Sequence, residues 1–442
     1  MSPESPRVFQ GPTVDRRIML KGLLGAAGVA ALPTLAACSS SSKSPTSTNG
    51  AASGTVSLGS NASDAVPKKA FQAVYDAFQT KSPGVSVKVN TKDHQTFQAD
   101  INSYLQGTPD DVFTWFAGYR MQFFAAKGLS NKINDVWDSI GSSFPSSVHD
   151  LSKGADGNYY FVPIYYYPWA VFYRKSVFAA KGYTVPTTWN DFVTLCEKMK
   201  NDGLTPIAFG DTDLWPAMGT FDYLNMRTNG YQFHMDLLHG KAAWTDAKVK
   251  KAFSYWTQIL PFHQAGYIGR KWEDAALTLI QKKAGMYLCG SFAAQQATNP
   301  ADLADLDFFA FPAIDPQWGQ DSVEAPVDGF MLSRSPKNRT AAVKLLEFIG
   351  STAGEGAYLK VDPSYNAIAN GYDTSSYNAL QTKAAALFGA AQHVSQFMDR
   401  DANPAFTSTV MQPQLQAYLQ NPGNIDSILT QIQNQQQAIY NS

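Results

Sequence analysis

The sequence has few charged residues, few histidines and few cysteines, and each shortage argues against a class of protein. Charged residues make up 16% of the 442 residues, and the formal net charge is −1. Because there is no basic block, the electrostatic signature of nucleic-acid binding is missing. Three cysteines do not make a disulfide framework, and six scattered histidines do not make a metal-ligand motif. We therefore expect no nucleic-acid partner, no metal and no other cofactor.

Aromatic residues, in contrast, are abundant. They make up 13% of the chain, including 21 Tyr and 9 Trp, within a hydrophobic fraction of 44%. A chain of this length and composition can bury a large core and is expected to fold as two or three domains. Tyr and Trp also line ligand sites, because they combine a flat apolar face with a polar group.

The first 37 residues are predicted to be a signal peptide. A basic segment around Arg16-Arg17 precedes an apolar stretch from Gly22 to Ala37, which is shorter than the roughly 20 residues of a membrane span. The paired arginines resemble a twin-arginine export signal, although Asp15 stands where Ser or Thr is usual.

The end of this segment predicts a lipid anchor. Leu35-Ala36-Ala37-Cys38 resembles a bacterial lipobox, and a Ser/Thr/Gly-rich linker over residues 38–54 follows it. Lipidation of Cys38 after cleavage would hold the protein on the outer face of the cytoplasmic membrane. The alternative is an ordinary secreted protein with a coincidental cysteine.

The remaining thiols, Cys196 and Cys289, are expected to be buried and free. Twin-arginine export carries folded proteins, so the chain would fold in a reducing cytosol. One disulfide between these two residues is the alternative.

Hydrophobic periodicity predicts an α/β fold with more than one sheet. Strands are expected at residues 55–59, 85–89 and 111–115, with helices between them, which implies parallel strands joined by right-handed crossovers. Ligands bind beyond the carboxyl ends of such strands. A clear amphipathic helix covers residues 338–349, whereas the Gln-rich tail from Ala405 has only a weak helical pattern.

Several short segments, in order along the chain, resemble the extracellular solute-binding proteins of bacterial ABC importers, specifically the sugar-binding group. The resemblance covers nearly all of residues 38–442. The segments are Thr108 to Trp115, Asp156 to Pro163, Ala170 to Lys175 (with Arg174 where Asn is common), Lys181 to Phe192, Lys283 to Met286, Phe308 to Pro312 and Val327 to Leu332.

The resemblance implies a two-lobed periplasmic-binding-protein-like fold of type II, with a mixed sheet and flanking helices in each lobe and several hinge crossings. Residues 55–163 and 327–362 would form the first lobe, and residues 164–326 and 363–442 the second. A sugar would bind between the lobes, unreacted and without a cofactor, and hinge closure would follow. The protein, a monomer, would then deliver the sugar to the permease and its ATPase.

Candidate ligand residues combine aromatic platforms with hydrogen-bonding side chains, as sugars require. Alternation along Tyr165-Tyr166-Tyr167-Pro168-Trp169 places Tyr165, Tyr167 and Trp169 on one side and Tyr166 on the other. The other candidates follow strand ends or lie at crossings: Trp215, Asp213, Trp115, Tyr119, Arg120, Asp328, Asn61, Asp64, His94, Ser291, Phe292 and Arg400. The density of aromatics favours a di- or oligosaccharide, such as an α-glucoside.

Three other classes compete with this interpretation. A glycosidase would need two carboxylates about 5–10 Å apart, and Asp211 with Asp328 is the pair that the sequence leaves open. A metal-binding lipoprotein would need clustered His, Asp or Cys. A peptide or amino-acid receptor would need an Arg–Asp pair for the charged ends of its ligand.

Overall fold

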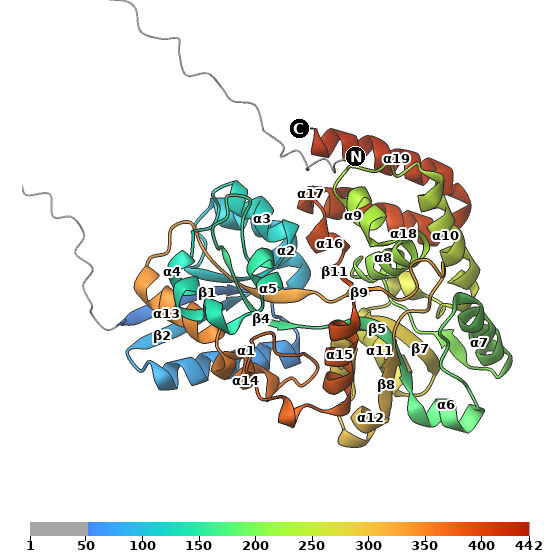
Figure 1. Cartoon of the computed structure of the whole chain (residues 1–442), viewed down its shortest axis with the longest axis horizontal. Coiled ribbons are helices and arrows are strands. Elements are labelled where there is room, and N and C mark those ends of the chain that lie inside the picture. The colour runs from blue at the N-terminus through green and yellow to red at the C-terminus, as the bar shows by residue number, and fades with distance from the viewer. Residues whose placement is uncertain (1–51, 442) are drawn as a thin grey trace, which may run out of the picture. The chain divides into compact units, whose positions relative to one another are not determined.

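The computed structural model describes residues 52–441. The predicted signal peptide, Cys38 and most of the linker lie outside the described residues. Within them, strands and helices alternate as an α/β protein, and the strands form one five-stranded, one four-stranded and one two-stranded sheet. The expected α/β class with more than one sheet is confirmed, and Figure 1 shows the two large sheets in separate halves of this unit.

The first sheet has the strand order β2-β1-β3-β10-β4. Strand β1 is parallel to both β2 and β3, as predicted, whereas β10 runs antiparallel to β3 and β4. The strands are β1 (Gly54–Ser60), β2 (Val85–Thr91), β3 (Val112–Phe116), β4 (Phe161–Tyr166) and β10 (Val327–Leu332).

Helices cover this first sheet. Helix α1 packs on α14 and α13, and α13 also packs on α4, β1 and β4. The amphipathic helix predicted at residues 338–349 is α13, whose first turn is capped by the side chain of Asn338 and which ends at Gly350. The helices are α1 (Ala65–Lys81), α2 (His94–Gln106), α3 (Tyr119–Ala126), α4 (Asn134–Ile140), α5 (Ser146–Leu151), α13 (Arg339–Ile349) and α14 (Thr352–Leu359).

The second large sheet has the order β6-β7-β5-β8. Strand β5 is antiparallel to β7 and β8, and β6 is parallel to β7. The small sheet pairs β9 with β11 in parallel. The strands are β5 (Trp169–Arg174), β6 (Thr205–Ile207), β7 (Ala284–Gly290), β8 (Leu306–Phe309), β9 (Ser322–Glu324) and β11 (His393–Ser395).

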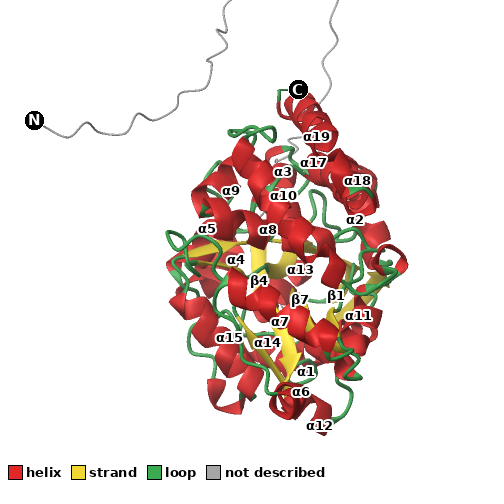
Figure 2. Ribbon diagram, turned by 90° about the vertical axis from the view of Figure 1, so that its right-hand side faces the viewer, coloured by secondary structure: helices red, strands yellow, loops and turns green. Residues whose placement is uncertain are grey.

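Helices flank the second sheet, and Figure 2 shows its strands enclosed by them. Trp189, at the start of α7, is buried against Phe192, Tyr255 and Phe311 and anchors this helix by packing. The helices are α6 (Lys175–Lys181), α7 (Trp189–Asn201), α8 (Pro216–Asn229), α9 (Tyr231–Leu238), α10 (Ala247–Ile259), α11 (Trp272–Ile280), α12 (Pro300–Asp305), α15 (Ala379–Ala390), α16 (Met398–Asp401), α17 (Pro404–Phe406), α18 (Gln412–Gln420) and α19 (Ile425–Tyr440).

The Gln-rich tail is more helical than its pattern indicates. It forms α18 and α19, and Tyr418 of α18 packs with ring centroids 4.7 Å from Phe253 and 5.2 Å from Trp256 of α10. Tertiary packing of a few apolar residues therefore stabilises a segment of weak intrinsic pattern.

The chain crosses between the two large sheets in three segments, around Tyr166, Pro326 and Asn366, and these segments lie side by side. Tyr166 and Asn366 exchange backbone hydrogen bonds, and the Tyr167 amide donates to the Pro326 carbonyl at 3.2 Å. The first two segments contain Pro168 and Pro326, whose rings restrict the backbone.

The expectation of free thiols is confirmed for the described residues, since Cys196 and Cys289 are both buried and unpaired. No helix among residues 52–441 combines the length and the apolar character needed to cross a membrane.

Candidate ligand-binding cavity

A cavity of about 180 Å³ lies between elements of the two large sheets. Its first-sheet side comes from the loop after β1, the start of α2 and strands β3, β4 and β10. Its second-sheet side comes from the start of β5 and the segments before α8 and at the start of α11. Residues near α16 complete the lining.

Aromatic rings form much of the cavity wall. Tyr165 stacks on Tyr365 with ring centroids 4.2 Å apart, and Trp169 meets Trp215 edge-on at 5.8 Å. Phe292 packs edge-on against Trp215 at 5.8 Å, so these rings hold one another in place. Such a wall offers flat apolar faces to the C–H groups of a ligand.

The strand alternation predicted for residues 165–169 is present. Tyr165, Tyr167 and Trp169 line the cavity, whereas the Tyr166 ring points elsewhere and packs on Phe388 at 4.4 Å. The short link at Tyr167 and Pro168 joins β4 to β5 without interrupting this one-sided arrangement.

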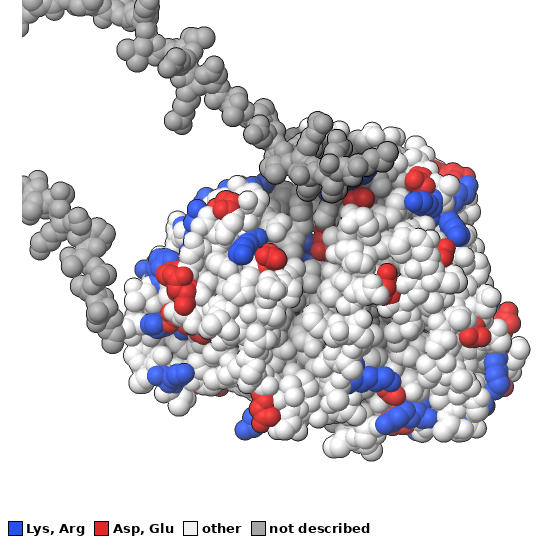
Figure 3. Space-filling view, in the orientation of Figure 1, with Lys and Arg blue, Asp and Glu red and all other residues white. Residues whose placement is uncertain are grey.

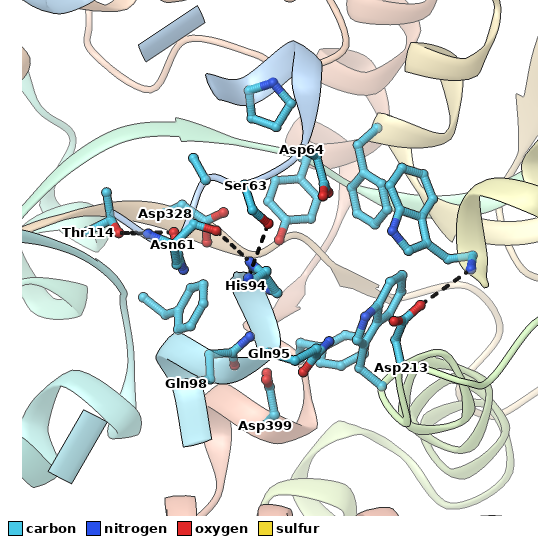
Figure 4. A pocket seen from close by; sticks show the side chains of 18 of the residues that line it. Asn61, Ser63, Asp64, His94, Gln95, Gln98, Thr114, Asp213, Asp328 and Asp399 are labelled. Carbon is cyan, nitrogen blue, oxygen red and sulfur yellow. Dashed lines mark hydrogen bonds between the residues drawn. The ribbon is translucent and has the colours of Figure 1, made fainter. Parts of the chain in front are cut away.

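The carboxyl ends of β1 and β2 supply polar groups to the cavity. The Thr114 hydroxyl donates to Asn61 Oδ1 at 2.9 Å and accepts from the Asn61 amide at 3.0 Å. The His94 amide donates to Ser63 Oγ at 3.1 Å, and its Nδ1 lies 3.3 Å from the Asn61 carbonyl (Figure 4). Asp93 caps α2 by accepting from the Thr96 amide, which orients His94 at the helix start. These loops meet at one edge because the strands are parallel.

Arg400 is the centre of a buried charged network on the cavity wall. Its Nη1 lies 2.9 Å from Asp328 Oδ1, and its Nη2 donates to the Tyr167 hydroxyl at 2.8 Å. Burial works against the charge of Arg400, but Asp328, Tyr167 and Asp399 outweigh it and raise its pKa. Burial likewise raises the pKa of Asp328, opposed by the charge of Arg400. The pair thus fixes polar atoms of both signs at the cavity surface.

A second arginine lies behind this network. Arg120 Nη1 donates to Asp399 Oδ2 at 2.9 Å and to Gln98 Oε1 at 2.7 Å, and its guanidinium lies 4.9 Å from the Trp115 ring centroid. Arg120 is absent from the cavity lining. It holds Asp399 in place instead, linking α3 to α16.

Backbone strain occurs at two points of the lining segments. Phe397, which precedes α16, has φ 95°, and Leu214, which precedes Trp215, has φ 66°. Non-glycine residues rarely adopt positive φ, and such strain is typical of binding and active sites.

The structure brings most of the predicted ligand residues to this one cavity. Those that line it are Asn61, Asp64, His94, Trp115, Tyr165, Tyr167, Trp169, Asp213, Trp215, Phe292, Asp328 and Arg400. Trp115 only borders it, since the residue is 1% exposed. Their contact with a ligand stays a prediction.

Three predicted residues lie outside the lining. Tyr119 packs against the His239 ring at 5.8 Å, and Arg120 supports Asp399 as described above. Ser291 donates its hydroxyl to the Ser364 carbonyl. Each follows a strand end, as predicted, but its side chain turns to a neighbouring segment.

The lining also includes residues that the sequence did not single out. Trp272, Glu273, Tyr365, Phe397 and Asp399 all border the cavity. Asp399 adjoins Arg400 and could have been included with it. Tyr365 follows no strand or motif, and Phe397 follows only the short strand β11, so the tertiary fold brings them here.

A chain with this fold and cavity fits the class of receptors that enclose a small ligand between two lobes. The sequence model of the family described as bacterial extracellular solute-binding protein matches residues 62–356. The chain belongs to this family.

Solved structures and curated relatives agree with this assignment. The bacterial solute receptor AcbH, described as having an exclusive substrate preference for β-D-galactopyranose, is 47% identical, with a TM-score of 0.85 over 87% of this chain and 99% of that one. An uncharacterised ABC transporter extracellular-binding protein of Pyrococcus horikoshii is 26% identical over 69% of this chain and 71% of its own length. A probable sugar-binding periplasmic protein of Rhizobium meliloti is 27% identical over 58% of this chain and 62% of its own length, so this match spans less than two thirds of that relative.

Proposed function

We propose that this chain is the sugar-binding protein of an ABC importer and that it holds its ligand in the cavity between the two large sheets. The observation that carries the proposal is the lining itself, with aromatic faces from Tyr165, Trp169 and Trp215 beside the fixed polar groups of Asn61 and Arg400. This is the combination that a pyranose needs, with its apolar C–H faces and its ring of hydroxyls. The sugar-binding relatives support it.

The ligand that we propose is a single sugar ring, in place of the di- or oligosaccharide expected from the sequence. The cavity volume is about 180 Å³, below the roughly 300 Å³ at the small end of ligand pockets. Trp169 and Phe397, with ring centroids 4.8 Å apart, close part of its wall. Galactose is the first candidate, because the 47% identical receptor prefers it.

Sugar capture would work through lobe closure. We assign the two lobes as expected from the sequence, except that β4 belongs to the first sheet as far as Tyr166. One lobe then comprises residues 55–166 and 327–362, and the other residues 167–326 and 363–442. The crossing segments would act as the hinge. A ligand that contacts both lobes favours the closed state by its differential affinity, and the closed form would then dock on the permease.

The family and fold point to binding rather than catalysis. Asp211, the proposed partner of Asp328 in a glycosidase, is absent from the cavity lining and accepts a hydrogen bond from the Ala217 amide at 2.8 Å instead. It therefore serves the start of α8. We further propose that Cys38 carries the lipid anchor, supported by the lipobox-like sequence that ends at Cys38. We also propose that the protein acts as a monomer.

Thermal-shift and calorimetric titrations of the protein with D-galactose, D-glucose, maltose and raffinose test the proposal. Binding to the native state raises apparent stability, by about 2.7 kcal/mol at a hundredfold excess over Kd. We expect a monosaccharide to give the largest shift, with all sugars recovered unchanged. Failure of every sugar to bind, or turnover of maltose or raffinose, would contradict the function. Tighter binding of maltose or raffinose would contradict the single-ring ligand.

A further inference from the structure

The charges that line the cavity are strongly unbalanced. Its carboxylates outnumber its cations, and the lining holds no basic side chain apart from Lys271, Arg400 and the imidazole of His94. The carboxylates are Asp64, Asp93, Asp213, Glu273, Asp328 and Asp399. Figure 3 shows acidic and basic side chains interspersed on the visible outer face, so the imbalance is a property of the cavity.

The arginine of the lining is already engaged. Arg400 lies 2.9 Å from Asp328 and 3.7 Å from Asp399, and it also donates to Tyr167. A ligand carboxylate or phosphate would have to compete with two carboxylates for this one guanidinium.

Three further carboxylates of the lining have no cation within ion-pair distance. Among the described residues, Asp64, Asp213 and Glu273 take part in no ion pair, and Lys271 beside them is exposed. Figure 4 shows Asp64 and Asp213 reaching the cavity from its opposite sides, and Asp213 receives only a long hydrogen bond from the Trp272 amide.

These three groups also interact with one another. Burial raises the pKa of both Asp213 and Glu273, and the charge of Asp64 acts on each in the same direction, whereas the charge of the exposed Lys271 opposes it. They therefore share one region of negative potential that spans the two sides of the cavity.

We propose that the cavity selects its sugar by charge, rejecting sugars that carry a carboxylate or phosphate, and that Asp64, Asp213 and Glu273 are the residues responsible. The inference rests on the proposed sugar-binding function and narrows its substrate class. Like charges brought together in a desolvated site repel each other strongly, which makes this rejection effective.

A matched pair of sugars tests the proposal by calorimetric titration at pH 7 and low salt. D-galacturonate and 6-amino-6-deoxy-D-galactose carry opposite charges on the same carbon, so the fit of that carbon affects both alike. D-glucuronate and 6-amino-6-deoxy-D-glucose serve as the matched pair if the protein prefers glucose to galactose. We expect the uncharged hexose and the amino sugar each to bind at least about tenfold more tightly than the uronate. Raising the salt concentration should reduce this difference in affinity.

Substitutions locate the effect. Asp64 makes no side-chain hydrogen bond at the start of α1, so Asp64→Asn should leave the fold intact. It should reduce the ratio of hexose affinity to uronate affinity about threefold. Asp213→Asn should act in the same direction. The matched control is Asp138→Asn, which removes an exposed carboxylate of α4 and should change nothing.

The outcomes separate the two proposals. The charge selection would be overturned if the uronate bound as tightly as the hexose, or if neither cavity substitution changed the ratio of the two affinities. The sugar-binding function would stand in either case. Absence of binding by every sugar in both sets would overturn the function itself, and the selection with it.

Discussion

Two groups of buried carboxylates near α16 differ in their partners. Toward the cavity, Asp328 and Asp399 are each within 4 Å of Arg400. In the second group, Asp222 and Glu324 are fully buried without an ion pair to Lys or Arg, and Asp222 accepts from the Met398 amide at 2.8 Å. A cationic partner lets a buried carboxylate keep its charge, whereas burial alone favours the protonated form.

The pKa values of the second group follow from this difference. Burial raises the pKa of Asp222 to about 8 and that of Glu324 well above its ordinary value. The Asp222 carboxyl raises the pKa of Glu324 further, through its charge and through a hydrogen bond between the two side chains. His234 Nε2 lies 3.6 Å from Asp222 Oδ1, but burial lowers the pKa of His234 to about 3, so it supplies no charge at neutral pH. The Asp222 carboxyl, which accepts from the Met398 amide, thus supports the start of the helix that presents Asp399 and Arg400 to the cavity.

Replacing Arg400 should have the largest effect. Arg400→Met leaves Asp328 buried without its cation, whereas Asp399 keeps Arg120. Breaking a buried pair from one side costs about 3–5 kcal/mol. We expect this loss in denaturant unfolding and a sugar affinity at least about a hundredfold lower in the folded fraction. Lys127→Met, which removes an exposed cation, is the control. Unchanged stability and affinity would show that the carboxylates do not need the arginine.

The pH dependence of stability tests the group without a cation. The folded pKa of Asp222, about 8, lies above its ordinary 3.8, so between these values the folded state holds a proton that the unfolded state releases. Stability should therefore fall as pH rises from about 4 to 8 and level off beyond. Asp401 and Glu355, whose pKa values burial raises to about 7 and 8, act in the same direction.

The variant Asp222→Asn isolates the part due to Asp222. It should reduce the loss of unfolding free energy between pH 5 and pH 8 by at least about 1.4 kcal/mol, the equivalent of one pKa unit. The control variant Asp138→Asn should not change the dependence of the unfolding free energy on pH. An equally steep slope in both variants would mean that Asp222 is ionised in the folded protein.

Removing an aromatic wall should have a smaller effect, confined to binding. Trp215 is half-buried at the cavity edge, so Trp215→Ala should weaken sugar binding by about 1 kcal/mol and cost little stability. The matched variant Trp189→Ala removes a buried ring at the start of α7. It should cost about 3–5 kcal/mol of stability, with sugar affinity retained in the folded protein. The reverse pattern would remove Trp215 from the site.

Much of the first lobe could be predicted because its signals are local. Alternating valines mark β2, and the caps and apolar spacing mark α2 and α13. The parallel order of β1, β2 and β3 then follows from the crossovers and places Asn61, Asp64 and His94 at one edge.

The rest depends on long-range packing. Tyr365 reaches the cavity by stacking on Tyr165, and Phe397 by a strained backbone ahead of α16, and neither leaves a periodic signal. Arg120 shows the opposite case, because its position after a strand end is a site signal, yet Asp399 draws the guanidinium away from the cavity lining. The tail helix α18 likewise owes its stability to the contact of Tyr418 with α10.

The central claim is that one sugar ring is held unreacted between the two large sheets. The most direct test is a crystal structure of the protein with the sugar that gives the largest thermal shift. The account predicts a single intact pyranose in the cavity, with a face against Trp169 or Trp215 and hydroxyls bonded to Asp328 and Arg400. A sugar bound elsewhere, or a chain of rings extending out of the cavity, would contradict it.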